Sequence, residues 1–114
     1  MAGEWTARAQ ILSGRPNPQW RLEAREAESL VEMWRSLPPF KGDLPKPPIL
    51  GYQGCSLQDV PGNREWYAFG GVVSQETMQG VDRRLDDRGL FERRLLASAP
   101  EGLLPDSLRN SLRF

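Results

Sequence analysis

The chain of 114 residues contains no histidine, a single cysteine and no apolar run of the ~18 residues that a membrane-spanning helix needs. Without histidine there is no histidine metal ligand, no histidine general base and no Ser-His or Cys-His nucleophile pair. The single cysteine, Cys55, cannot form an internal disulfide. We therefore expect no common catalytic site, no metal and no other cofactor.

The chain also lacks an excess of charge, because 15 basic and 15 acidic residues give a formal net charge of zero. Nonspecific binding to nucleic acid and polybasic contact with a membrane both need a surplus of positive charge. We therefore expect neither nucleic acid nor a membrane as a partner. Residues 1–5 lack the basic and apolar regions of a secretory signal, so the sequence predicts a cytoplasmic protein.

What is present is the composition of a folded globular chain, with 39% hydrophobic and 26% charged residues. A chain of this length supports one hydrophobic core of modest size. The sequence therefore predicts a single α+β domain over residues 1–114.

The first third of the chain predicts a β-hairpin followed by a helix. Apolar and polar residues alternate in Trp5–Leu12 and again in Gln19–Leu22, which is the period of half-buried strands. Over residues 23–37 apolar residues recur at spacings of three and four, which predicts a helix with one apolar face. Pro38 and Pro39 end this helix, because proline cannot continue it.

Residues 38–48 are rich in proline, and we expect a stiff, extended crossover that lies over the core through Phe40 and Leu44. A proline-rich ligand for an aromatic groove is the alternative. Residues 49–60 and 64–75 then predict a second hairpin around a turn at residues 61–63. Glycines within both predicted strands indicate a bulge or tight packing, or alternatively a close approach by a ligand; they are Gly51, Gly54, Gly70 and Gly71.

Residues 74–81 are expected to be irregular. Asp86 or Asp87 can cap a helix that runs to about Ser98, and Asp106 can cap a last short helix through Leu112. The order β-β-α-β-β-α-α predicts an α+β fold, with a four-stranded antiparallel sheet from two hairpins and the helices packed on one face. The sequence does not fix the strand order, and an edge strand stays unpaired unless something covers it.

The strongest local motif is the turn of the first hairpin, Ser-Gly-Arg-Pro-Asn-Pro-Gln-Trp over residues 13–20. Pro16 and Pro18 fix two φ angles, so a rigid loop presents Arg15, Asn17 and Trp20. A rigid loop suits ligand contact because little conformational entropy is lost on binding. The alternative is an ordinary hairpin turn, with Arg15 in solvent and Trp20 in the core.

Aromatic side chains gather in the second predicted hairpin. Within one strand, Trp66 points to one face of the sheet and Tyr67 to the other, and Tyr52 lies on the preceding strand. Aromatic residues that no helix covers are a common surface for a peptide or another partner, whereas cross-strand pairing that buries them is the alternative. The candidate peptide-binding residues are Arg15, Asn17, Trp20, Tyr52, Trp66 and Tyr67.

Cys55 is the only candidate nucleophile of the thiol type. A catalytic thiol needs a base or a positive neighbour to lower its pKa, and a lone strand cysteine without one is typical of a small buried apolar residue. The sequence therefore predicts that the protein is not an enzyme. A small enzyme that uses Cys55, Tyr52 or the carboxylates of Asp86 and Asp87 is the competing hypothesis.

The motif at residues 13–20, Ser-Gly-Arg-Pro-Asn-Pro-x-Trp, resembles the N-terminal hallmark of a group of small bacterial proteins. Their amphipathic helix and proline-containing crossover are similar to residues 23–48, and their Arg-Arg-Leu-Leu helix is similar to residues 93–96. This group includes peptide-binding accessory proteins of the crocagin pathway, which makes a ribosomally synthesised, modified peptide in myxobacteria. The resemblance implies a protein that binds a precursor peptide, forms homodimers or heterodimers, and performs no catalysis itself.

We therefore expect a non-catalytic peptide-binding accessory protein that adds an extended precursor peptide to a sheet edge. The alternative is a structural or regulatory subunit that forms a homo- or heterodimer with another folded protein through the same aromatic residues.

Overall fold

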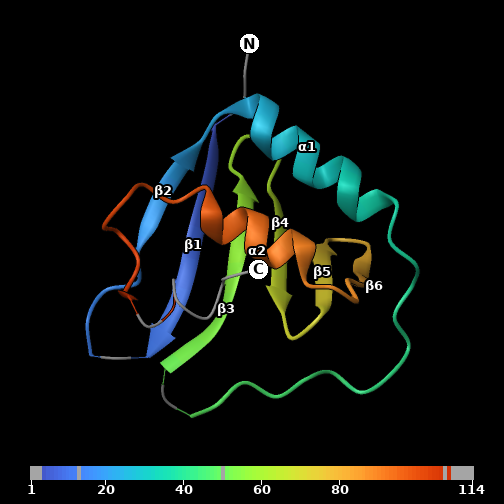
Figure 1. The fold of residues 1–114 in the computed structure, drawn as a ribbon. Coiled ribbons are helices and arrows are strands. Elements are labelled where there is room, and N and C mark those ends of the chain that lie inside the picture. The colour runs from blue at the N-terminus through green and yellow to red at the C-terminus, as the bar shows by residue number, and fades with distance from the viewer. Residues whose placement is uncertain (1–3, 13, 50, 107, 109–114) are drawn as a thin grey trace.

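The computed structural model describes residues 4–12, 14–49, 51–106 and 108. Its elements are two strands, β1 (Trp5–Leu12) and β2 (Gln19–Leu22), the helix α1 (Ala24–Arg35), four strands, β3 (Gly51–Asp59), β4 (Arg64–Phe69), β5 (Val72–Thr77) and β6 (Gly80–Leu85), and the helix α2 (Leu90–Ala97). The strands form one antiparallel sheet in the order β2-β1-β3-β4-β5-β6. Both helices cover the same face of this sheet (Figure 1).

The α+β class and the antiparallel sheet are confirmed, but the prediction of four strands is wrong because the sheet has six. Residues 64–75 form two strands rather than one. Gly70 and Gly71 have φ angles of +61° and +89°, which lets the chain reverse between Phe69 and Val72. These glycines therefore form a turn and lie outside both strands.

The prediction of irregular structure at residues 74–81 is also wrong. β5 continues to Thr77, and a two-residue turn of Met78 and Gln79 leads directly into β6. β6 is an edge strand whose first four residues are all exposed. A strand in such a position has no apolar face to bury, so its sequence lacks the alternation that marked β1.

Each helix begins and ends where the chemistry of its termini requires. α1 turns Ala27, Leu30, Val31 and Trp34 toward the sheet and ends just before Pro38. α2 begins after the left-handed Gly89, and Asp86 caps it. The Asp86 carboxylate accepts hydrogen bonds from the Leu90 and Phe91 amides at 3.0 and 2.9 Å. The last short helix predicted for residues 106–112 lies mostly outside the described residues.

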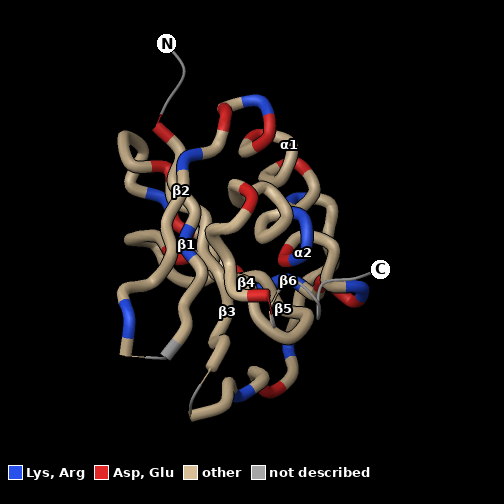
Figure 2. The backbone as a smooth tube through the Cα atoms, turned by 60° about the vertical axis from the view of Figure 1, so that its left-hand side comes forward, with Lys and Arg blue, Asp and Glu red and all other residues tan. Residues whose placement is uncertain are grey.

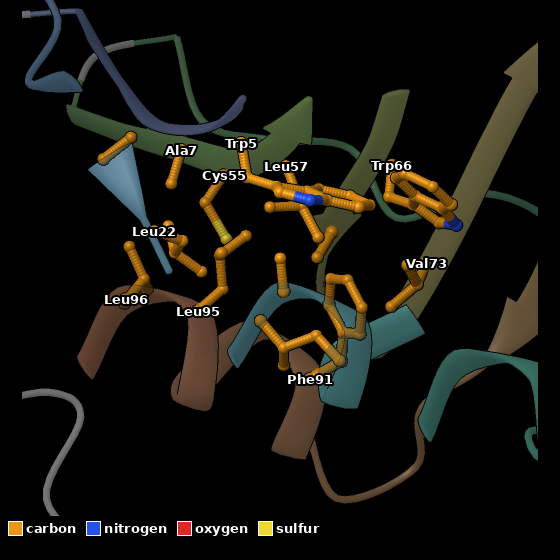
Figure 3. Packing of buried hydrophobic residues seen from close by; sticks show 14 of the residues in the cluster. Trp5, Ala7, Leu22, Cys55, Leu57, Trp66, Val73, Phe91, Leu95 and Leu96 are labelled. Carbon is orange, nitrogen blue, oxygen red and sulfur yellow. The ribbon is translucent and has the colours of Figure 1, made fainter. Parts of the chain in front are cut away.

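The core lies between the helices and the sheet. Figure 3 shows side chains of the sheet pointing toward those of α2: Trp5, Cys55, Leu57 and Trp66 on one side, and Phe91, Leu95 and Leu96 on the other. Trp66 is fully buried, and its ring stacks on Trp5 with ring centres 5.9 Å apart and meets Trp34 edge-on at 6.3 Å. The same core therefore binds elements from both halves of the chain.

The proline-rich crossover joins α1 to β3 along the outside of the molecule (Figure 1). It pairs with β6, where the Phe40 amide donates to the Arg83 carbonyl at 2.9 Å and the Leu85 amide donates to the Pro38 carbonyl at 2.8 Å. Further along, Leu44, Pro45 and Pro47 border a hollow of about 230 Å³ on the sheet face that the helices leave open. In the described part of the chain no helix is long and apolar enough to span a membrane.

Candidate functional site

The outer side of β2 is one of the two edges of the sheet. The Ala9 amide donates to the Pro18 carbonyl at 3.1 Å, so Ala9 and Pro18 form a hydrogen-bonded pair. Such pairs alternate with non-bonded ones in an antiparallel ladder, so the next bonded partners of β1 are Trp20 and Leu22. The N–H and C=O groups of Gln19 and Arg21 therefore point away from β1.

These four main-chain groups have no hydrogen-bond partner within the residues that the structure describes. Gln19 and Arg21 are both exposed, so the groups face solvent. An uncovered strand edge is a template for a further strand, because each unpaired N–H and C=O can bond an extended backbone. The outer side of β2, which we call the β2 edge, is therefore a candidate site for an extended peptide.

The hairpin turn beside the β2 edge is held in place by its own polar contacts. The Asn17 Oδ1 atom accepts a hydrogen bond from the Ile11 amide at 2.9 Å, and Pro18 pairs with Ala9 as described. The Asn17 side chain thus ties the loop to β1, and Arg15 lies exposed on the same loop. Ser13 lies outside the described residues.

A groove of about 460 Å³ lies beside the β2 edge on the side of the helices. Its lining comes from the end of β2, the start of α1 and the end of α2: Arg21, Leu22, Glu23, Glu26, Arg94, Ala97 and Ser98. Arg94 contacts Glu26 at 3.4 Å and donates to Ser29 at 3.1 Å, so these polar groups are already engaged. The rest of the wall consists of Arg21, Leu22 and Glu23 at the end of β2 and of Ala97 and Ser98 at the end of α2.

Trp20 attaches the β2 edge to α2. Its ring is only 5% exposed, and its indole N–H donates to the Ser98 hydroxyl at 2.9 Å. The Ser98 hydroxyl in turn donates to the Leu95 carbonyl at 2.6 Å. The position of the groove wall is therefore fixed by a chain of bonds from the strand to the helix.

The face of the sheet opposite the helices is basic near β2. Arg21 and Arg8 lie on this face of β2 and β1, and Arg15 lies on the loop between them; Figure 2 shows blue positions along this side of the molecule. With the Gln19 amide turned so that its oxygen accepts, Arg8 donates to it at 2.8 and 2.6 Å. The carboxylate nearest to Arg21 is that of Glu4, at 3.7 Å.

The other edge of the sheet, β6, is partly closed. Its outward groups belong to Val81, Arg83 and Leu85, and the crossover bonds the Arg83 carbonyl and the Leu85 amide. Val81 lies nearer to the hairpin tip, and its main-chain groups have no partner within the described residues. The sheet therefore has one edge that is open along its length and one that is covered over half its length.

The structure does not gather the six predicted site residues in one place. Arg15 and Asn17 border the β2 edge, and Trp20 lies beneath it with its ring in the core. Trp66 is fully buried between Trp5 and Trp34, so its ring offers no surface to a ligand. The interpretation that kept Trp20 in the core and Arg15 in solvent matches what is observed.

Tyr52 and Tyr67 lie elsewhere, toward the other end of β3 and β4. Tyr52 donates from its hydroxyl to the Glu92 Oε2 atom at 2.5 Å, while the Tyr67 hydroxyl donates to the Gln53 carbonyl on the opposite face. Gly54 makes the second contact possible, because a Cβ on its left-handed backbone would lie 2.6 Å from the Tyr67 hydroxyl oxygen. Tight packing, rather than a ligand groove, thus explains this glycine.

Three titratable groups lie between β3 and α2: Cys55, which is fully buried, and Tyr52 and Glu92, which are partly buried. Burial raises the pKa of the Cys55 thiol, and the Glu92 carboxylate raises it further. Burial also raises the pKa of the Tyr52 and Tyr67 hydroxyls. The pKa of Glu92 is raised by burial and by Asp86, against the stabilising hydrogen bonds of Tyr52 and the Gly70 backbone. Burial and Glu92 thus disfavour the thiolate form of Cys55, which is the opposite of an activated nucleophile.

The carboxylates of Asp86 and Asp87 do not act as a pair. Asp86 is 3% exposed and uses both oxygens to cap α2, whereas Asp87 is exposed. Within the described residues, no three Cys, Asp or Glu side chains come together as a metal site would require. The β2 edge can therefore bind an extended peptide through main-chain hydrogen bonds and through the guanidinium groups of the nearby arginines.

Sequence reasoning missed Arg8, Arg21 and the wall of the groove. The alternation of β1 and β2 placed Arg8 and Arg21 on the polar face, so their shared face was available as a signal. The sequence carries no signal for which strand lies at the edge of the sheet, because the edge depends on the pairing of β1 with β3.

Comparison of the chain with protein-family models, with curated proteins and with solved structures gave no match.

Proposed function

We propose that the protein is a non-catalytic peptide-binding accessory protein that adds an extended peptide to the β2 edge. The observation that carries this proposal is the set of four main-chain groups on Gln19 and Arg21 that have no partner among the described residues. Main-chain hydrogen bonds supply affinity in such complexes, and flanking pockets select the side chains. The groove beside β2 and the rigid loop that bears Arg15 supply this flanking surface.

The ligand we propose is a precursor peptide of a ribosomally synthesised, modified natural product. The support for this choice is the resemblance of residues 13–20 to the crocagin accessory proteins, since that motif forms the turn at one end of the β2 edge. Burial and the raised pKa of Cys55 support a binding role in preference to thiol chemistry.

The experiment is a calorimetric titration with overlapping segments, each of about twelve residues, of the precursor peptide encoded beside the gene. We expect at least one segment to bind with a dissociation constant below ~100 µM. Arg21→Pro removes an outward N–H without removing a bond to β1, so it should weaken binding about tenfold. Arg21→Gln removes the same positive charge but keeps the main-chain N–H, so the difference between the two variants measures the loss of the donor.

Val81→Pro is the matched control, because it removes an outward N–H from the other edge and should leave the affinity unchanged. The proposal is contradicted if no segment binds below ~100 µM. It is equally contradicted if Arg21→Pro binds the segment as tightly as the parent protein and the Val81→Pro control do.

A second candidate function is a subunit that pairs with a second copy of the chain through the uncovered half of β6. Met78 and Val81 are 99% and 50% exposed at this hairpin, where the outward main-chain groups of Val81 have no partner in the described part of the chain. Sedimentation at ~100 µM tests it: a dimer that Val81→Glu dissociates supports this function, and a monomer contradicts it.

A further inference from the structure

A strand added to the β2 edge would carry two rows of side chains with different surroundings. Successive side chains of a strand point to opposite faces, and those of neighbouring strands about 4.8 Å apart lie side by side. Residues of the peptide that lie beside Gln19 and Arg21 would share their face, away from the helices. The residues between them would point over the groove that Leu22, Ala97 and Ser98 border.

The first row would meet positive charge. Arg8, Arg15 and Arg21 lie on or beside this face, and among the residues that the structure describes the one carboxylate in an ion pair with them is Glu4, at 3.7 Å from Arg21. The side chains of this ion pair are 83% and 67% exposed, so the pair neutralises Arg21 weakly. The next carboxylates on this face, Glu65 and Glu76, are on β4 and β5, at least three strands away.

The second row would meet a surface of a different kind. Arg94 and Glu26 contact each other across the groove, so neither offers an uncompensated charge. Near β2 the wall is formed by Arg21, Leu22, Glu23, Ala97 and Ser98, whose hydroxyl is already bonded on both sides. Leu22 and Ala97 form the apolar part of this wall, which suits small apolar side chains, whereas Glu23 disfavours an acidic side chain.

We infer that the peptide bound at the β2 edge is an extended segment with acidic residues at alternate positions and small apolar residues between them. This inference rests on the proposed function and specifies the chemistry of its ligand. The acidic residues would face Arg8, Arg15 and Arg21, and the apolar residues would cover the groove.

The test compares four synthetic peptides of about eight residues, labelled for fluorescence anisotropy and blocked at both ends. They alternate Glu with Val, Thr with Val, or Lys with Val, and the fourth holds the same Glu and Val residues in two blocks. We expect the Glu–Val peptide to bind about tenfold more tightly than the Thr–Val peptide and more tightly still than the Lys–Val peptide. Its affinity should fall as salt is added.

Arg21→Glu should reverse the preference between the Glu–Val and Lys–Val peptides. Arg83→Glu is the matched control, because Arg83 is exposed on the same face at the other edge, and it should leave the preference unchanged. If the Glu–Val, Thr–Val and Lys–Val peptides bind with equal affinity, the inference is overturned and edge binding stays intact. The same holds if the peptide with Glu and Val in two blocks binds as tightly as the alternating Glu–Val peptide. Binding by none of the four overturns edge binding and this inference together.

Discussion

The two edges of the sheet are built from similar strands but differ in what lies beside them. At β6 the crossover supplies an extended segment, and the Phe40 amide and the Pro38 carbonyl bond the strand. At β2 the equivalent groups of Gln19 and Arg21 have no partner within the described residues. The covered edge shows that this sheet accepts an added extended segment, and the open edge is where we propose that another binds.

The difference follows from where proline lies in the chain. Pro38 and Pro39 stop α1 beside β6, so the chain leaves the helix in an extended form along that edge. Pro18 ends the loop just before β2, and α1 begins directly after the strand, so no segment of the described chain is left to pair with it. The β6 edge is therefore covered by the segment that follows α1, whereas the chain enters α1 directly after β2.

The largest effect is expected where the crossover meets the sheet. Gly70→Ala would place a Cβ 2.8 Å from the Pro45 ring on a backbone with φ of +61°. We expect a loss of about 2–3 kcal/mol in the free energy of unfolding, measured by denaturant titration, of which about 1 kcal/mol is backbone strain. Gly14→Ala is the control, because its φ is +78° and nothing lies within 4 Å of the added atom. Equal losses in the two variants would show that the crossover does not press on the sheet there.

Asp86 lies where the covered edge leads into α2. Asp86→Ala leaves the Leu90 and Phe91 amides without their acceptor, so we expect a loss of about 2 kcal/mol in the free energy of unfolding. Asp87→Ala should change it by less than about 0.5 kcal/mol, because Asp87 is exposed. Thermal unfolding of both variants measures the difference, and similar melting temperatures would contradict the role of Asp86 as a cap.

The attachment of the open edge to α2 is a smaller contribution. Ser98→Ala leaves the buried indole N–H of Trp20 without an acceptor and should cost about 1–2 kcal/mol. Combining it with Trp20→Phe removes both partners, so the double variant should lose less than the sum of the two single losses. Strictly additive losses in this double-mutant cycle would mean that the bond does not hold the strand.

The smallest effect is a dependence on pH that comes from Glu92. Because burial raises its pKa in the folded state, the folded protein holds a proton that the unfolded chain has already released, and stability falls as pH rises between the two pKa values. Glu92→Gln keeps an acceptor for the Tyr52 hydroxyl and removes this titration. The variant should show a flatter profile of melting temperature above pH ~4.5 and a higher value at neutral pH. An unchanged slope would assign the pH dependence to other groups.

The parts of the fold that the sequence predicts are those with strong periodicity. β1, β2 and α1 bury one side of a regular pattern, and each was located to within a residue or two. β6 has no such pattern because it lies exposed at an edge. Gly70 and Gly71 were predicted to lie within one strand, although they form the turn between β4 and β5. The number of strands was wrong for these two reasons.

The candidate site could be predicted only in part. The proline-fixed loop marks one end of the β2 edge, and Arg15 and Asn17 lie there as a local pattern can indicate. Period two shows that Trp66 and Tyr67 occupy opposite faces but not which face the helices cover, and Trp66 lies on the covered one. The identity of the edge strand depends on contacts between residues far apart in the sequence, as in the pairing of β1 with β3.

Hydrogen exchange of individual amides tests the difference between the two edges most directly. In the free protein, the Gln19 and Arg21 amides should exchange rapidly, while the bonded amides of Phe40 and Leu85 should be protected. A bound peptide should slow exchange at Gln19 and Arg21 about tenfold or more and leave Phe40 and Leu85 unchanged. Protection of Gln19 and Arg21 in the free protein, or their continued rapid exchange with peptide bound, would contradict the assignment of the β2 edge as the binding site.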